Sequence, residues 1–142
     1  MKKLFITLAA IYCALIVVAA PNEKVLNTFK TTFPNAQSVI WADDNQSYVA
    51  YFSLNNIKCR LWYNADGVVI KSIRYYSAAE LPPFIRSSVD HKYSDKKIFG
   101  VTEVTSEEGL EYNIVLEDET HWYDITSDGS GNISMKNKFK KA

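Results

Sequence analysis

The first feature of the hydrophobic pattern is an apolar stretch at the amino-terminal end. Two lysines precede a run from Leu4 to Val18 that only Thr7 interrupts, and small residues follow before Pro21. This order of charged, apolar and small residues is typical of a secretory signal peptide. The run of about 15 residues is shorter than the roughly 20 that a membrane-spanning helix requires, although an anchor remains the alternative. We therefore expect residues 1–19 to be a signal peptide that is cleaved after export.

The next pattern has helical spacing and then changes to strand-like alternation. Asn22 is a good N-cap residue, and apolar residues at 25, 26, 29 and 33 recur at the period of a helix. Pro34 disfavours helical geometry in the residue before it, so the helix is expected to end near Thr32. Four runs rich in β-branched and aromatic residues then predict strands: Ser38–Trp41, Ser47–Ser53, Ile57–Tyr63 and Val68–Tyr76.

The same order of elements follows a second time. Ser77 and Glu80 have the spacing of a capping box, and the pair Pro82-Pro83 is compatible only with the first turn of a helix. Four further strands are predicted at Lys97–Val104, Leu110–Glu117, Thr120–Thr126 and Ile133–Lys136.

The two halves of the chain therefore look like one unit written twice. Positions 29 and 33 correspond to 89 and 93, positions 48, 50 and 52 correspond to 112, 114 and 116, and Asp66-Gly67 corresponds to Asp128-Gly129, 62 residues later. We predict an α+β fold: a tandem repeat of a helix plus a four-stranded antiparallel meander, with both helices packed on one face of a single curved sheet. Residues 20–142 would form one domain of two repeats, about 22–76 and 77–136.

Charge and cysteine content narrow the classes of function. The chain has 16 basic and 16 acidic residues, and removal of the signal peptide takes away two of the lysines. The mature chain has no basic excess, so nucleic acid is not an expected partner. Cys59 is the one cysteine left after cleavage, which excludes an internal disulfide. Its place in an alternating strand predicts a small buried side chain.

Catalytic and metal-binding patterns are scarce. The candidates for a nucleophile or base are Cys59, His91 and His121, and no Gly-x-Ser-x-Gly elbow or phosphate-binding loop accompanies them. The segment from Asp124 to Gly129 begins like a calcium loop, but Met135 occupies the twelfth position, where a bidentate Glu is needed. We therefore predict no enzymatic activity, no metal site and no cofactor.

The most informative residues are those that alternation turns away from the helices. Side chains of a strand point alternately to the two faces of a sheet. If residues 48, 50, 52, 59, 61 and 63 face the helices, and residues 121, 123 and 125 do the same in the second half, the opposite face collects Tyr51, Arg60, Trp62 and Trp122. These residue types dominate binding hot spots. Cross-strand stabilisation of the sheet by the same aromatics is the alternative, and a single bulge would exchange the two faces.

At this level the chain resembles the PepSY-like, beta-lactamase-inhibitor-like (BLIP-like) proteins, which are secreted or periplasmic. The resemblance covers about residues 22–136. It is carried by Phe33-Pro34-Asn35-Ala36, Val39-Ile40-Trp41, the Tyr48/Ala50/Phe52 alternation, Asn64-Ala65-Asp66-Gly67 and Leu81-Pro82. It implies the tandem fold described above and, by analogy with the inhibitor, protein binding through a concave sheet. No inhibitory loop can be carried over to this sequence.

Together these patterns predict a non-enzymatic binding module in the periplasm or outside the cell, with no membrane span after cleavage. A protein or peptide is the expected partner, and inhibition of a hydrolase would be a special case. The alternative is a small molecule or glycan stacked on Tyr51, Arg60, Trp62 and Trp122. A weak enzyme using His121 or Cys59 is a third hypothesis.

Overall fold

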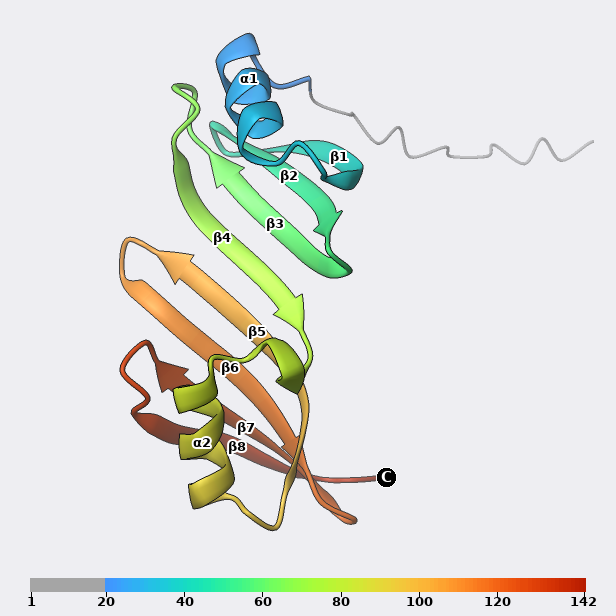
Figure 1. Ribbon diagram of the computed structural model, residues 1–142, viewed down its shortest axis with the longest axis vertical. Coiled ribbons are helices and arrows are strands. Elements are labelled where there is room, and N and C mark those ends of the chain that lie inside the picture. Colours follow the sequence, from blue (N-terminus) through green and yellow to red (C-terminus); the bar gives the residue numbers. More distant parts are fainter. Residues whose placement is uncertain (1–19) are drawn as a thin grey trace, which may run out of the picture.

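The computed structural model describes residues 20–142, so the predicted signal peptide lies outside the described residues (Figure 1). In chain order the elements are α1 (Glu23–Thr32), β1 (Gln37–Asp44), β2 (Ser47–Leu54), β3 (Ile57–Tyr63), β4 (Val69–Tyr76), the short 3-10 helix η1 (Ala78–Glu80), α2 (Pro83–Lys92), β5 (Lys97–Ser106), β6 (Gly109–Glu117), β7 (His121–Asp128) and β8 (Ile133–Lys140). The predicted order of elements is confirmed, and β1 and β8 extend further than predicted.

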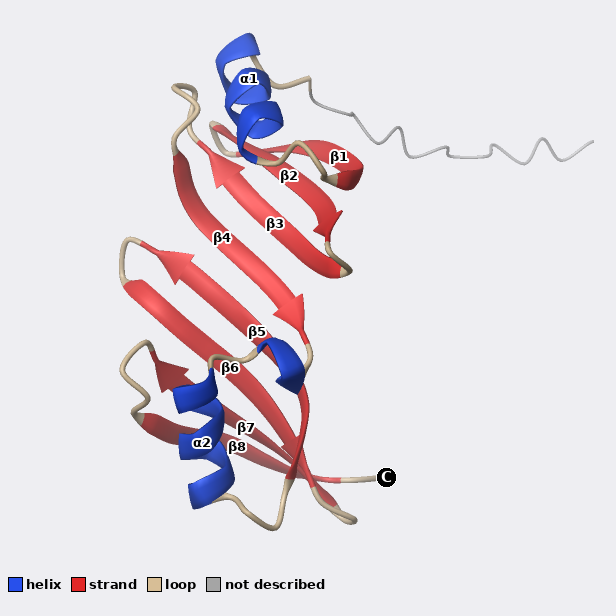
Figure 2. Cartoon of the chain, viewed as in Figure 1, coloured by secondary structure: helices blue, strands red, loops and turns tan. Residues whose placement is uncertain are grey.

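The eight strands form one antiparallel sheet in which sequence order is also spatial order, as Figure 2 shows. Residues paired directly across neighbouring strands share a face of the sheet. One such row runs from Cys59 through Arg74 and Glu103 to Tyr112. Cys59 packs in the core beneath α1 and Tyr112 in the core beneath α2, so both helices cover the same face. The predicted fold is therefore confirmed.

Both α-helices begin at residue types that favour a helix start: α1 follows the cap residue Asn22, and α2 begins at Pro83. The side chain of Asn22 accepts a hydrogen bond from the backbone of Val25, which satisfies one of the donors at the start of α1. The predicted capping box of Ser77 and Glu80 is present, but it caps η1, and α2 begins at Pro83. Among residues 20–142 we find no helix with the length and apolar character needed to span a membrane.

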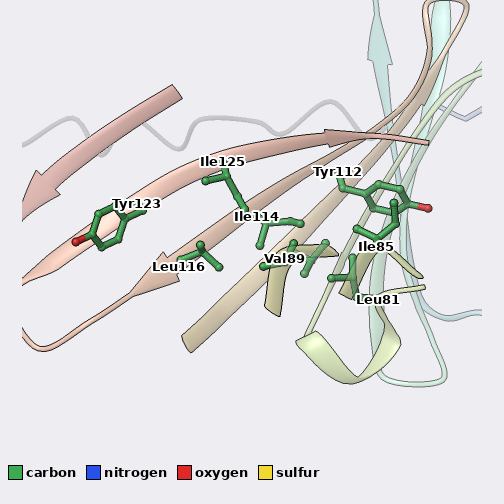
Figure 3. Close-up of a cluster of buried hydrophobic side chains, with 9 residues drawn as sticks. Leu81, Ile85, Val89, Tyr112, Ile114, Leu116, Tyr123 and Ile125 are labelled. Atoms are coloured by element: carbon green, nitrogen blue, oxygen red, sulfur yellow. The ribbon is translucent and has the colours of Figure 1, made fainter. Parts of the chain in front are cut away.

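The apolar face of the sheet is divided into two separate cores. In the first half, Val25 and Phe29 of α1 pack on the inward residues of β2 and β3, among them Phe52 and Leu61. In the second half, Ile85 and Val89 of α2 pack on β5, β6 and β7; Figure 3 shows this cluster. The full second cluster is Leu81, Ile85, Val89, Val101, Tyr112, Ile114, Leu116, Tyr123 and Ile125.

The two halves meet at the β4–β5 strand pair, where a partly buried carboxylate joins them. Glu103 of β5 accepts a hydrogen bond from Arg74 at 3.1 Å and another from the hydroxyl of Tyr76 at 2.6 Å, both on β4. Burial and this bond raise the pKa of Tyr76. Among the described residues, no other side-chain hydrogen bond in the structure connects the two halves. Glu103 therefore adds side-chain contacts to the backbone pairing of β4 with β5.

The internal duplication is present, but one predicted correspondence is wrong. In the first half, Asn64 accepts hydrogen bonds from the backbone of Asp66 and Val68. In the second half, Asp128 does the same for Ser130 and Asn132. These turns place Gly67 with Gly131, 64 residues later, and not with Gly129.

The change in the interval between equivalent residues of the two halves arises at a hairpin. The helices and their ends are related by 60 residues, since Val25 and Phe29 occupy the places of Ile85 and Val89. The β5–β6 hairpin is two residue pairs longer than the β1–β2 hairpin, as the pairs Trp41↔Ala50 and Val101↔Ile114 show. This extension adds four residues to the second half, which changes the interval from 60 to 64.

Two tyrosines give a matched test of what a buried hydroxyl contributes. The hydroxyl of Tyr63 is buried without a hydrogen-bond partner, and burial raises its pKa to about 12. Tyr63→Phe removes an unpaired polar group, so we expect the free energy of unfolding to stay the same or rise by about 1 kcal/mol. Tyr76→Phe leaves Glu103 short of a donor, and we expect a loss of about 1–3 kcal/mol. Urea denaturation measures both, and equal losses in the two variants would contradict the assignment.

Candidate functional site

The structure places all four predicted site residues on the sheet face turned away from the helices, here called the outer face. Cys59, Leu61 and Tyr63 pack beneath α1, so Arg60 and Trp62 between them point the other way. Tyr51 lies between the inward residues 50 and 52, and Trp122 precedes the inward Tyr123. The strand phase predicted from alternation therefore holds in β2, β3 and β7.

Three of the four residues form one stack, which we call the first aromatic patch: Tyr51, Arg60 and Trp62. The guanidinium of Arg60 lies 4.8 Å from the ring centre of Tyr51 and 4.3 Å from that of Trp62. Such cation–π contacts hold an arginine in a fixed orientation. The stack follows from register, because Tyr51 pairs directly with Arg60 across the β2–β3 hairpin.

Trp62 is less accessible than the sequence suggested. Its side chain is on the outer face, yet only 7% of the residue is exposed. Arg60 covers one part of the indole, and the amino group of Lys71 lies 5.0 Å from the ring centre. The indole nitrogen donates a hydrogen bond to Asp44 at 2.8 Å. The indole of Trp62 is therefore covered by two cationic side chains, and the accessible members of the patch are Tyr51 and Arg60.

The surroundings of this patch are cationic and apolar. Lys58, Arg60 and Lys71 make no ion pair with any described residue. The Nε atom of Arg60 is also buried without a hydrogen-bond partner. Ile40 and Tyr75 flank the patch and are 58% and 43% exposed. An arrangement of this kind can bind a carboxylate next to an apolar or aromatic side chain.

A shallow hollow lies beside the patch. Its volume is about 290 Å³, and its lining residues are Ser38, Tyr51, Phe52, Ser53, Lys58, Cys59, Arg60 and Tyr75. One wall comes from a β-bulge in β1, where Ser38 has φ +54° and the pairing with β2 shifts between Gln37 and Ile40. Positive φ is uncommon outside glycine, and bulges often redirect side chains near functional sites.

Trp122 belongs to a different place on the same face. Its ring centre lies 4.9 Å from that of Phe99 in an edge-to-face arrangement, and it pairs with Phe139 on β8. We call Phe99, Trp122 and Phe139 the second aromatic patch. Lys141 lies 4.4 Å from the Trp122 ring and forms an ion pair with Glu117 at 2.7 Å.

The two aromatic patches are too far apart to form one small site. Trp62 is on β3 and Trp122 on β7, four strand positions away. At about 4.8 Å between neighbouring strands, the separation across the sheet is roughly 19 Å. A single small ligand cannot contact both patches, whereas a protein surface can.

Sequence reasoning missed four exposed members of this face: Ile40, Tyr75, Phe99 and Phe139. Tyr75 could have been found by continuing the alternation from Lys58, with which it pairs. Phe99 could not, because the pairing of β5 with β6 shifts between Ile98 and Gly100 and reverses the simple alternation there.

The remaining candidates lie on three different elements, Cys59 on β3, His91 on α2 and His121 on β7. Cys59 is buried, and desolvation raises the pKa of its thiol. His91 is exposed on α2, while His121 lies next to Thr120 with its Nδ1 atom 2.8 Å from the threonine hydroxyl. Within residues 20–142, no group of three or more His, Cys, Asp or Glu is placed to hold a metal ion. The calcium-like segment is a hairpin turn in which Asp128 accepts backbone hydrogen bonds.

A wider hollow of about 610 Å³ lies at the acidic β6–β7 turn and includes Asp118. The carboxylate of Asp118 accepts bonds from the backbone of Thr120 and His121 and from the Tyr123 hydroxyl, which hold its pKa well below the usual range. The carboxylate of Asp118 therefore stabilises the turn through these hydrogen bonds.

The fold is found in solved structures of Bacteroides proteins. A BLIP-like protein from Bacteroides fragilis matches with a TM-score of 0.63 and 17% identity, over 86% of this chain and 87% of that one. A DUF2874 family protein from Bacteroides ovatus matches at 0.62 and 21%, over 86% and 89%. A protein from Bacteroides eggerthii, described as a candidate periplasmic protein, matches at 0.61 and 20%, over 86% and 90%.

These likenesses confirm the predicted BLIP-like fold. At such identities they show the fold alone. No protein-family model matches the sequence, and no curated protein matches it at a significant level.

Proposed function

We propose that this chain is an exported, non-enzymatic binding module that holds a protein or peptide on the outer face of its sheet. The observation that carries the proposal is the stack of Arg60 between Tyr51 and Trp62. It presents a partly buried cation against two aromatic rings, with no ion pair to any described residue. Tyr, Trp and Arg are the side chains that contribute most to protein–protein affinity.

Export is supported by the signal-like pattern of residues 1–19 and by the description of the Bacteroides eggerthii neighbour. A non-enzymatic role is supported by the burial of Cys59 and by the separate positions of His91 and His121 on α2 and β7. A binding role is also supported by the BLIP-like likeness.

The cationic surroundings indicate which peptides should bind. Lys58, Arg60 and Lys71 favour a segment that carries Asp or Glu, and exposed Ile40 and Tyr75 favour an apolar residue next to it. We therefore expect acidic peptides with at least one large apolar side chain.

A selection from a displayed random-peptide library tests the proposal on residues 20–142. We expect the unmodified protein to enrich acidic peptides, and Tyr51→Ala and Arg60→Ala to weaken their binding by about tenfold or more. Phe84→Ala is the matched control, because Phe84 is an aromatic residue on α2 that is 53% exposed on the helix side. It should bind like the unmodified protein.

The choice of variants follows from the burial of Trp62. Trp62→Ala would remove a buried side chain and its bond to Asp44, so a loss of binding would be confounded with a loss of stability. Undiminished binding in both Tyr51→Ala and Arg60→Ala, with unchanged melting temperatures, would show that the outer face is not the site.

The second candidate function is the binding of a small molecule or glycan, which the hollow of about 290 Å³ beside Tyr51 and Arg60 favours. Binding on a glycan array that Tyr51→Ala removes, together with no enrichment from the peptide library, would support this second candidate and contradict the first.

A further inference from the structure

We propose that the outer face binds a second copy of this chain, face to face and in opposite strand order, so that the cationic half of each copy lies on the acidic half of the other. The inference rests on the proposed function, because it uses the same face and names a protein partner for it. Four observations carry it: a self-complementary row of residues, unpaired charges in both halves, a hollow opposite an exposed tyrosine, and the symmetry of the sheet.

The row crosses six strands at one level of the outer face. Direct cross-strand pairs place in line, from β2 to β7, Tyr51, Arg60, Ile73, Val104, Glu111 and Asp128. The cation on β3 and the anion on β6 lie at equal distances from the centre of the sheet between β4 and β5. The two central residues, Ile73 and Val104, are apolar. The row is therefore positive at one end, apolar in the middle and negative at the other end.

A two-fold axis parallel to the strands, between β4 and β5, makes such a row complementary to itself. It lays β3 of one copy on β6 of the other, so that Arg60 meets the partner copy's Glu111 and the reverse pair forms by symmetry. Ile73 then meets Val104 at the axis. Two packed sheets lie about 10 Å apart and prefer strand directions within about 30° of each other, which this arrangement satisfies near its centre.

Several charged residues on the outer face of the two halves form no ion pair within residues 20–142. On the outer face of the first half, Lys58, Arg60 and Lys71 form no ion pair with any described residue. On the outer face of the second half, Glu111 and Asp124 form none either, although Asp124 accepts a hydrogen bond from Asn137. The first half thus offers cations without an ion pair and the second half carboxylates without one, beside Asp44 in the first half and Lys136 in the second, which carry the opposite charge.

The neighbouring row adds a match of shape. In this row Lys58 and Tyr75 of the first half lie in line with Thr102 and Asn113 of the second half. Tyr75 is 43% exposed. A hollow of about 300 Å³ is lined by Thr102, Asn113, Asp124 and Lys136, among others. The same two-fold axis lays Tyr75 over the Thr102 side of this hollow and Lys58 over Asn113, close to Asp124.

The area of the outer face sets the expected affinity of the dimer. Six strands at about 4.8 Å spacing and about 17 Å length give a total buried area at or below the lower end of stable interfaces, roughly 1,200 Å². We therefore expect a reversible dimer that is weakened by salt, because the contact depends on facing charges.

Sedimentation equilibrium of residues 20–142, from about 10 to 500 µM protein and from about 20 to 500 mM NaCl, tests the proposal. We expect a monomer–dimer equilibrium at low salt. Arg60→Glu and Glu111→Arg should each weaken self-association by about tenfold or more, because each places like charges opposite one another. Lys30→Glu, a reversal on the exposed surface of α1, is the matched control and should dimerise normally.

Mixing the two reversed variants gives the decisive result. A chain with Glu at 60 and a chain with Arg at 111 regain both ion pairs, so an equimolar mixture should form a heterodimer. The double variant Arg60→Glu/Glu111→Arg should again self-associate. Melting temperatures of the single variants near that of the unmodified protein ensure that any loss reflects the contact and not the fold.

Three results would overturn this inference. They are a monomer at all concentrations in low salt, a dimer that persists in both single variants, and single variants that fail to associate when mixed. A monomeric protein that still enriches acidic peptides would leave the proposed function standing while removing the second copy as its partner. A dimer that binds no peptide would keep the second copy as the partner of the outer face and remove the acidic peptide.

Discussion

Phe29→Ala is expected to lower the free energy of unfolding by about 3–5 kcal/mol, the range observed when a buried aromatic side chain is truncated. Phe29 lies at the centre of the first core and is 4% exposed. Its ring centre is 5.2 Å from that of Trp41, 5.0 Å from that of Phe52 and 5.5 Å from that of Phe33. Truncation therefore removes the one side chain that these aromatic rings share.

Such a loss is a large part of the roughly 5–15 kcal/mol by which domains are usually stable. Urea denaturation followed by tryptophan fluorescence measures it, because Trp41 and Trp62 report on the first half. Phe84→Ala, at the exposed phenylalanine of α2, should change stability by less than about 0.5 kcal/mol. Similar losses in the two variants would show that the first core is not organised around Phe29.

Gly67→Ala is the second substitution with a large expected effect. Gly67 has φ +79°, and a β-carbon there would lie 2.9 Å from the hydroxyl oxygen of Thr28 and 3.3 Å from the backbone oxygen of Lys24. The left-handed backbone alone costs a non-glycine residue about 1–2 kcal/mol. The close approach of the turn to α1 adds a clash, so we expect a total loss of about 2–4 kcal/mol.

The duplication supplies the matched controls for this prediction. Gly131 occupies the equivalent turn with φ +88°, but its β-carbon would meet nothing closer than 3.5 Å. Gly131→Ala should therefore show the backbone cost without the clash. Gly100→Ala, where no atom lies within 4 Å, should be close to neutral. Thermal unfolding ranks the three, and a smaller loss for Gly67→Ala than for Gly131→Ala would contradict the packing of this turn on α1.

The sequence predicted the features of the fold that depend on local periodicity. Helical spacing at residues 25 and 29 and alternation through Cys59 and Leu61 gave the elements and their inward faces, because a buried face leaves a strand one acceptable phase. The turn correspondence at Gly129 was wrong because it matched the pair Asp-Gly by residue type, whereas the turn is organised by the side-chain acceptor, which is Asn64 in one half and Asp128 in the other.

The candidate site was predictable to a smaller extent. Alternation placed Trp62 and Trp122 on the outer face, but it carries no information about what covers a side chain there. Lys71 covers Trp62 from the neighbouring strand, and that contact depends on the β3–β4 register. Likewise, the distance between the two tryptophans depends on the number of strands between them, and Phe99 reaches the outer face through a bulge.

The two cores beneath a single sheet have a consequence for how molecules of this protein can combine. Separation of β4 from β5 leaves each helix with its own apolar cluster; it breaks the strand pair, the contacts of Glu103 and the packing of Tyr76 on the second cluster. It also creates two new sheet edges, and the β4 edge of one molecule fits the β5 edge of another. The fold therefore contains a route to domain swapping, in which molecules exchange whole halves while every hydrophobic contact is kept.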